Sequence, residues 1–190
     1  MTSFWPVPLT QPDRRTCGPS VLVALRMAES PDYRDRVLAG GPRSAQARFA
    51  SEARAAHRTT SRVLDGRGRL QVPWARALGT APWALARQVR GRAVYVVLRR
   101  RRAGAYDALV ASLATGPTPV YVGTRWLPRH VVLAVAVADG VVTCYEPASG
   151  RRTRFTREAW LRGRLQGCGG WPVPWAVVSR GPRPARRTPA

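Results

Sequence analysis

The sequence predicts an α+β protein in which helices come first along the chain and an antiparallel sheet follows. Up to Arg90 the apolar residues recur at helical spacing, whereas from Arg92 onward short apolar runs alternate with turn residues. Two such runs, 130–138 and 141–145, are separated by Asp139-Gly140, which is a strong short-range signal for a hairpin. Helices followed by strands in this order are typical of the α+β class.

The first predicted helix spans Pro19 to Glu29. Proline is tolerated in a first helical turn because the amide hydrogen that it lacks would have no partner there. Val21, Leu22 and Leu25 then give an apolar face at helical spacing, and Ser30-Pro31 ends the helix. The other predictions for this half are a helix over 44–57, a polar loop over 58–70 and a helical segment over 75–90 that is broken at Pro82.

The second half predicts the sheet and two further helices. The strands 130–138 and 141–145 are expected to be antiparallel neighbours. Thr156 is expected to cap a helix over 156–165, because a threonine hydroxyl can accept from an amide of the first turn. The other predicted elements are strands over 92–98, 119–123 and 175–179, an extension of the sheet at Arg154 and Phe155, and a helix over 105–114.

Length and composition indicate one globular domain. A chain of 190 residues can build one domain with its own core. Apolar residues make up 45% and charged residues 22%, which is a globular composition. From Arg180 onward the chain has almost nothing to bury. We therefore expect a single domain over 1–179 and a disordered tail, rich in arginine and proline, over 180–190.

The net charge of +22 would ordinarily indicate a nucleic-acid partner. All 32 basic residues are arginines, however, so a genome-wide drift toward arginine codons explains the charge without a ligand. The longest basic run, Arg99 to Arg102, has four members and follows a predicted strand. We expect weak, salt-sensitive attraction to polyanions and no specific nucleic-acid partner.

Neither a membrane segment nor a metal site is expected. No apolar stretch approaches the roughly 20 residues of a membrane helix, and the first residues lack the basic and apolar regions of a signal peptide. These features predict a cytoplasmic protein. Three cysteines argue against a disulfide framework. The residues Cys17, Cys144, Cys168, His57 and His130 lack the close pairs that zinc sites use, so no cofactor is predicted.

Three points far apart in the sequence carry residues suited to nucleophilic catalysis. Cys17 stands where the first predicted helix begins, and the positive end of a helix dipole stabilises a thiolate there. His130 opens a predicted strand, whose rigid backbone can hold an imidazole in place. The hairpin returns Glu146 to the same end of the sheet, where its carboxylate can fix the orientation of the imidazole. Acyl transfer also needs donors to the oxyanion, and the Cys17 amide and the Gln11 side chain are candidates.

The motifs at these points resemble those of the C39-like cysteine peptidases of the papain-like superfamily. They are Gln-x5-Cys-Gly-Pro, His-Val-Val, and an acidic residue followed by Pro-Ala-Ser-Gly, within residues 9–29 and 126–152. The resemblance is to a free-standing form with no transporter attached. It implies a papain-like fold, in which the N-terminal helix that carries the cysteine packs on an antiparallel sheet that carries the histidine. It also implies Gln11 as the oxyanion donor, Cys17 as the nucleophile, His130 as the base and acid, and Glu146, where the family usually has aspartate, as the residue that orients the histidine.

We therefore expect a thiol hydrolase that cleaves a peptide or amide bond of a peptide or protein substrate through an acyl-enzyme on Cys17. Acyl transfer to an amine would use the same residues. Two alternatives stay open: a papain-like binding module without activity, suggested by the glutamate, and an arginine-rich nucleic-acid-binding protein, which requires the charge to lie on one face. Trp126 is a candidate wall of the substrate cleft. Cys144 is expected in the core, Cys168 in a loop and His57 at the surface.

Overall fold

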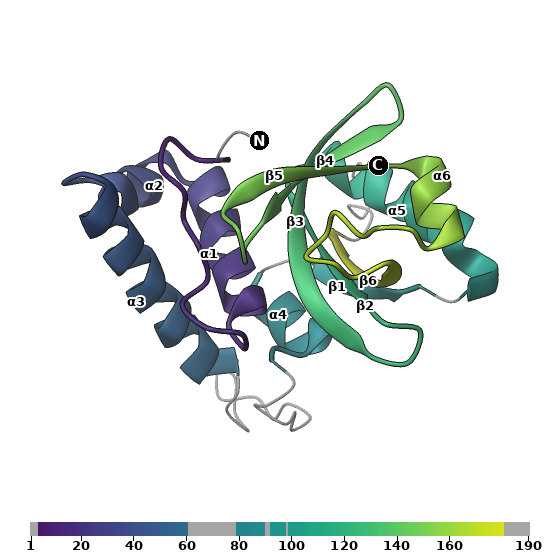
Figure 1. Ribbon diagram of the computed structural model, residues 1–190, viewed down its shortest axis with the longest axis horizontal. Coiled ribbons are helices and arrows are strands. Elements are labelled where there is room, and N and C mark those ends of the chain that lie inside the picture. Colours follow the sequence, from purple (N-terminus) through teal and green to yellow (C-terminus); the bar gives the residue numbers. More distant parts are fainter. Residues whose placement is uncertain (1–3, 61–78, 90–91, 98, 181–190) are drawn as a thin grey trace, which may run out of the picture.

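The protein consists of helices packed on both sides of one antiparallel sheet, as Figure 1 shows for the computed structural model. The structure describes residues 4–60, 79–89, 92–97 and 99–180. Its helices are α1 (Cys17–Glu29), α2 (Pro31–Leu38), α3 (Pro42–Thr60), α4 (Pro82–Gln88), α5 (Arg102–Leu113) and α6 (Arg157–Arg162), with a 3-10 turn over Arg99–Arg101. The predicted α+β class is confirmed.

The sheet has six strands in the order β1-β6-β2-β3-β4-β5, and every neighbouring pair is antiparallel. The strands are β1 (Arg92–Val96), β2 (Thr118–Gly123), β3 (Pro128–Ala138), β4 (Val141–Glu146), β5 (Arg151–Thr156) and β6 (Val173–Arg180). The predicted hairpin between β3 and β4 is confirmed. Asp139 and Gly140 both have positive φ, 51° and 71°, as a two-residue turn that matches the strand twist requires.

The sheet separates two hydrophobic cores. On one face, Val131 and Leu133 of β3 pack with α1, α3 and α4. On the other face, Val132 and Ala134 pack with α5 and α6. Because side chains alternate between the faces of a strand and both faces are covered here, β3 carries a nearly continuous apolar run.

Several elements differ from the sequence prediction. Helix α2 was not predicted; the Ser30 hydroxyl accepts from the Tyr33 amide, and Pro31 occupies its first turn. Pro82 begins α4, because proline suits the first helical turn, and the described residues before it, 79–81, are not helical. Strand β6 is longer than the predicted 175–179, and its place between β1 and β2 inside the sheet was not predicted. Helix α6 has the predicted Thr156 cap, whose hydroxyl accepts from Ala159, but ends at Arg162.

Some predictions fall partly on residues outside the described part of the chain. Residues 58–60, predicted as the start of a loop, complete α3, and the rest of that loop, 61–70, is not described. Residues 75–78 of the predicted helical segment also lie outside. Arg180, placed in the tail by the sequence prediction, is the last residue of β6, and the tail over 181–190 is not described.

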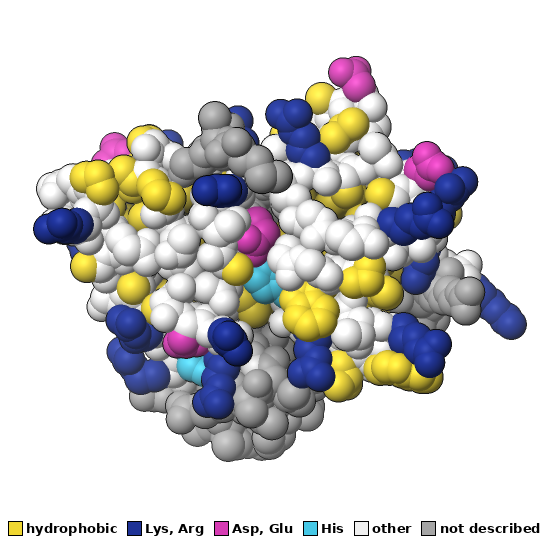
Figure 2. All heavy atoms as spheres, in the orientation of Figure 1, with side chains coloured by type: hydrophobic (Ala, Val, Ile, Leu, Met, Phe, Trp, Pro, Cys, Tyr) yellow, Lys and Arg dark blue, Asp and Glu magenta, His cyan; other side chains and the backbone are white. Residues whose placement is uncertain are grey.

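The distribution of basic side chains and the character of the helices are relevant to nucleic-acid and membrane partners. Figure 2 shows basic side chains at several separate places on one face of the molecule. Within the described residues, no helix has the length and apolar character needed to cross a membrane.

Candidate active site

The β3–β4 hairpin brings His130 and Glu146 into direct contact. Tyr145 pairs with Leu133 across the hairpin, so Glu146 lies at the end of β4 that faces the beginning of β3. His130 Nε2 is 2.7 Å from Glu146 Oε1, and both side chains are about 95% buried. The contact predicted between these two residues is therefore present.

The turn that follows Glu146 holds its carboxylate in place. Oε1 accepts from the Ala148 amide at 2.8 Å, and Oε2 accepts from the Ser149 amide at 2.8 Å and from the Ser149 hydroxyl at 2.6 Å. Burial raises the pKa of Glu146, but the hydrogen bonds from His130, Ser149 and Ala148 lower it by more, so that the net pKa is about 2. The carboxylate is thus ionised at neutral pH. Glutamate has one methylene more than aspartate, and the side chain accommodates it by folding back onto the turn that follows Glu146.

Cys17 and His130 line one small pocket, together with Thr80 and Tyr121. Burial lowers the pKa of His130, but hydrogen bonds to Cys17 and Glu146 and the charges of these two groups raise it, with a net value of about 9. The imidazole is therefore protonated at neutral pH. Because Glu146 occupies Nε2, the ring nitrogen that remains for Cys17 is Nδ1.

Cys17 is the first residue of α1, two positions before the predicted start of this helix. The preceding Thr16 makes no side-chain cap, because its hydroxyl donates to the Asp13 carbonyl at 3.0 Å, and no acidic residue lies in the first turn. The positive end of the helix dipole is thus left to act on the sulfur. Gly18 lets α1 approach Thr80: a Cβ at this position would lie 2.8 Å from the Thr80 Cβ.

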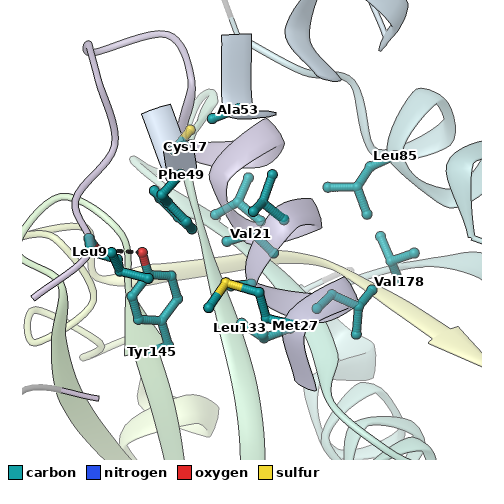
Figure 3. Packing of buried hydrophobic residues seen from close by; sticks show 14 of the residues in the cluster. Leu9, Cys17, Val21, Met27, Phe49, Ala53, Leu85, Leu133, Tyr145 and Val178 are labelled. Carbon is teal, nitrogen blue, oxygen red and sulfur yellow. Dashed lines mark hydrogen bonds between the residues drawn. The ribbon is translucent and has the colours of Figure 1, made fainter. Parts of the chain in front are cut away.

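Gln11 lies on the extended strap, residues 4–16, that precedes α1. This strap is tied to the β4 end of the sheet, because Tyr145 donates to the Leu9 carbonyl at 2.6 Å (Figure 3) and the Gln11 amide donates to the Pro147 carbonyl at 2.7 Å. Gln11 Nε2 donates to the Asp13 carbonyl at 2.8 Å, and a second hydrogen remains on this nitrogen. The structure thus places Gln11 beside the turn that follows Glu146.

A glycine of the loop before β6 lies against the imidazole of His130. Gly169 has φ of 65°, and a Cβ there would lie 2.8 Å from His130 Cδ2 and 3.0 Å from Nε2. Neither Gly169 nor Ser149 was predicted as part of the site. Ser149 could have been found from its position three residues after Glu146, where serine often bonds an acidic side chain in a turn. Gly169 lies far along the chain and has no such signal.

The other two cysteines are buried and poorly suited to attack. Cys144 lies in the core, as predicted, and burial raises its pKa well above the ordinary value. Cys168 precedes Gly169 in a loop, as predicted, but is fully buried; burial and then the charge of Glu146 raise its pKa to about 12. His57, predicted at the surface, is half-buried near the end of α3.

An apolar cavity adjoins the Cys17 pocket. It measures about 230 Å³, is lined by Trp83, Trp175 and other apolar side chains, and shares Pro82 and Pro128 with the Cys17 pocket. The space beside Cys17 itself is only about 10 Å³, roughly enough for one water molecule. Trp126, the predicted cleft wall, lines neither of these two cavities and is 69% exposed, with the Arg125 guanidinium 4.2 Å from its ring centroid.

Three segments that are distant in the sequence meet in this site: the beginning of α1, the beginning of β3 and the end of β4. A buried carboxylate, a protonated imidazole and a thiol at a helix N-terminus can together carry out nucleophilic acyl transfer. Comparison of the sequence with protein-family models found no match, and comparison with curated proteins found none either. The functional assignment therefore depends on the chemistry of this site and on the resemblance of its motifs.

Proposed function

We propose that the protein is a papain-like cysteine peptidase, or a related thiol hydrolase, that cleaves a peptide or amide bond through an acyl-enzyme on Cys17. The observation that carries the proposal is the buried imidazole of His130, which lies between a helix-terminal thiol and an ionised carboxylate. These are the positions that the resemblance to C39-like peptidases assigns to nucleophile, base and orienting residue.

In the acylation step, the Cys17 sulfur attacks the carbonyl carbon of the scissile bond as a thiolate paired with the His130 imidazolium. The carbonyl oxygen becomes an oxyanion, for which the Cys17 amide and the free Nε2 hydrogen of Gln11 are the candidate donors. When the C–N bond breaks, the imidazolium gives its proton to the leaving amine. The products of this step are a thioester on Cys17, a neutral His130 and a free amine.

In the deacylation step, neutral His130 takes a proton from water, and the hydroxide oxygen adds to the thioester carbonyl. Collapse of this intermediate breaks the C–S bond, releases the acid and restores the thiolate beside the imidazolium. Glu146 accepts a hydrogen bond from Nε2 throughout, so Nδ1 stays directed at the reacting atoms. An amine in place of water would give acyl transfer by the same sequence of steps.

The shape of the site favours a particular kind of peptide. With about 10 Å³ beside Cys17, a glycine at the scissile bond fits better than a larger residue. The adjoining apolar cavity of about 230 Å³ would take an apolar side chain of the same peptide. A small residue at the cleaved bond also agrees with the resemblance, since C39 peptidases cut after a double glycine.

The alternative of an inactive papain-like binding module was suggested by glutamate in place of aspartate. The hydrogen bond from His130 to Glu146 removes that reason, because the longer side chain still reaches the imidazole. The alternative of a nucleic-acid-binding protein would be supported only if the protein bound nucleic acid at moderate salt concentration.

The proposal is tested by brief alkylation of the folded protein with limiting iodoacetamide at about pH 6, where an ordinary thiol is almost wholly protonated. Peptide mass mapping then compares the three cysteines. We expect fast, selective labelling of Cys17 and its loss in His130→Ala. This substitution enlarges the space beside Cys17, so slower labelling cannot result from reduced access. Labelling of Cys17 no faster than that of Cys144 and Cys168 would refute the proposal.

A further inference from the structure

A third cavity, of about 480 Å³, lies between the strap that precedes α1 and the C-terminal part of α3. Four of its seven lining residues are arginines, whereas arginine accounts for 32 of the 190 residues overall. Figure 2 shows basic side chains gathered around a histidine and an acidic side chain at the lower left of the molecule. We call this the arginine cavity; its basic residues are Arg14, Arg15, Arg54, Arg58 and His57.

The four guanidinium groups of the arginine cavity form no ion pair with a carboxylate in the described part of the chain. Asp13 is the carboxylate that lines the cavity, and its Oδ1 accepts from the backbone amide of Arg15 at 2.8 Å. The α3 dipole favours basic residues in its last turn, such as Arg58, but does not account for the arginines of the strap. The four arginines are exposed and line the same cavity, and like charges that share one space repel one another, so an anion bound among them is stabilised.

The arginine cavity and the proposed catalytic pocket are lined by consecutive residues of the chain. Thr16 lines the arginine cavity, and the next residue, Cys17, lines the pocket that contains His130. The Cα atoms of consecutive residues are about 3.8 Å apart, and an extended peptide advances about 3.3 Å per residue. A few residues of an extended peptide are therefore long enough to span the distance from Cys17 to the arginine cavity.

We propose that the arginine cavity binds an acidic segment of the peptide substrate, with aspartate or glutamate carboxylates among the four guanidinium groups while the scissile bond lies at Cys17. This inference rests on the proposed function, because it assigns the substrate of that site. Guanidinium groups suit the ligand because each can donate two parallel hydrogen bonds to one carboxylate.

Binding is measured in Cys17→Ala, so that no cleavage occurs, with a fluorescein-labelled glycine-alanine peptide that carries three adjacent glutamates and with its glutamine counterpart. The test variant adds Arg54→Gln and Arg58→Gln. The matched control adds Arg43→Gln and Arg154→Gln, which remove the same charge from exposed positions outside the cavity. We expect the glutamate peptide to bind more tightly, the test variant to lose affinity on the order of tenfold, and the control to lose little.

Equal losses in the two variants would overturn the proposal, because they would show that net charge alone attracts the peptide. Inorganic phosphate that displaces the peptide at comparable concentration would also overturn it, since the cavity would then select a small anion. In the protein with intact Cys17, the glutamate peptide should slow alkylation of Cys17, and should fail to do so when Arg54 and Arg58 are replaced. Selective alkylation without such protection would refute only the arginine cavity's role, whereas unselective alkylation would refute the proposed function itself.

Discussion

Gly169→Ala tests whether the imidazole of His130 must lie where the structure places it. The new Cβ would lie 2.8 Å from His130 Cδ2, whereas ordinary contact begins near 3.4 Å, so the ring or the loop must move by about 0.6 Å. A misplacement of about 1 Å at a catalytic group costs on the order of 10²-fold in rate, so we expect a loss on the order of tenfold.

Gly170→Ala is the matched control. Gly170 also has positive φ, 83° against 65° for Gly169, so alanine at either position costs about 1 to 2 kcal/mol of backbone strain. A Cβ at Gly170, however, has nothing within 4 Å. The two variants therefore share the strain and differ in contact with His130.

The assay is the rate of Cys17 alkylation by iodoacetamide at about pH 6, with urea unfolding to confirm that both variants are folded. We expect Gly170→Ala to label Cys17 at close to the wild-type rate and Gly169→Ala to label it about ten times more slowly. Equal rates in two folded variants would refute the reasoning that Gly169 positions the imidazole.

The remaining predictions concern the charge network. Glu146→Gln should lower the pKa of His130 and slow Cys17 alkylation at about pH 6 by at least tenfold. The control Glu158→Gln, at an exposed glutamate of α6, should change neither quantity. Equal effects of the two substitutions would contradict the role of Glu146. Ser149→Ala removes the 2.6 Å hydrogen bond to the Glu146 carboxylate and should lower the free energy of unfolding by about 1.5 to 3 kcal/mol. The control Ser51→Ala, on the exposed face of α3, should change it little. An unchanged free energy of unfolding in Ser149→Ala would show that this bond does not stabilise the fold. Because the pKa of His130 is raised from 6.5 to about 9 in the folded protein, its protonation stabilises the fold fully below pH 6.5, and this contribution is lost as the pH rises through about 9. The free energy of unfolding should therefore fall between these pH values, and less steeply in Cys17→Ala; equal slopes would argue against the coupling.

The elements that could be predicted from the sequence are those with strong local signals. The turn at Asp139-Gly140 fixes two adjacent strands, and this adjacency alone brings His130 and Glu146 to the same end of the sheet. The presence of α1 follows from its proline and apolar face, although the helix begins at Cys17, two residues before the predicted start. These features need no knowledge of distant parts of the chain.

The features that could not be predicted depend on long-range packing. Strand β6 lies between β1 and β2, an order that no local pattern encodes. Gly169 contacts the imidazole only because the loop before β6 returns across the sheet. Helix α2 has few apolar residues, with Val37 the buried one, so its periodicity is weak. Trp126, a large apolar side chain, was expected at the cleft but lies exposed on the β2–β3 turn, where Trp175 donates to the Thr124 carbonyl.

The central claim is that Cys17, His130 and Glu146 form one charge-coupled site, and the most direct test is an NMR pH titration of the histidine imidazoles. The protein has two histidines, so His57 serves as an internal reference. The account predicts that His130 titrates near pH 9 in the wild-type protein and at lower pH in Cys17→Ala, while His57 is unchanged. A His130 titration at or below pH 6.5, or one that is the same in both proteins, would contradict it.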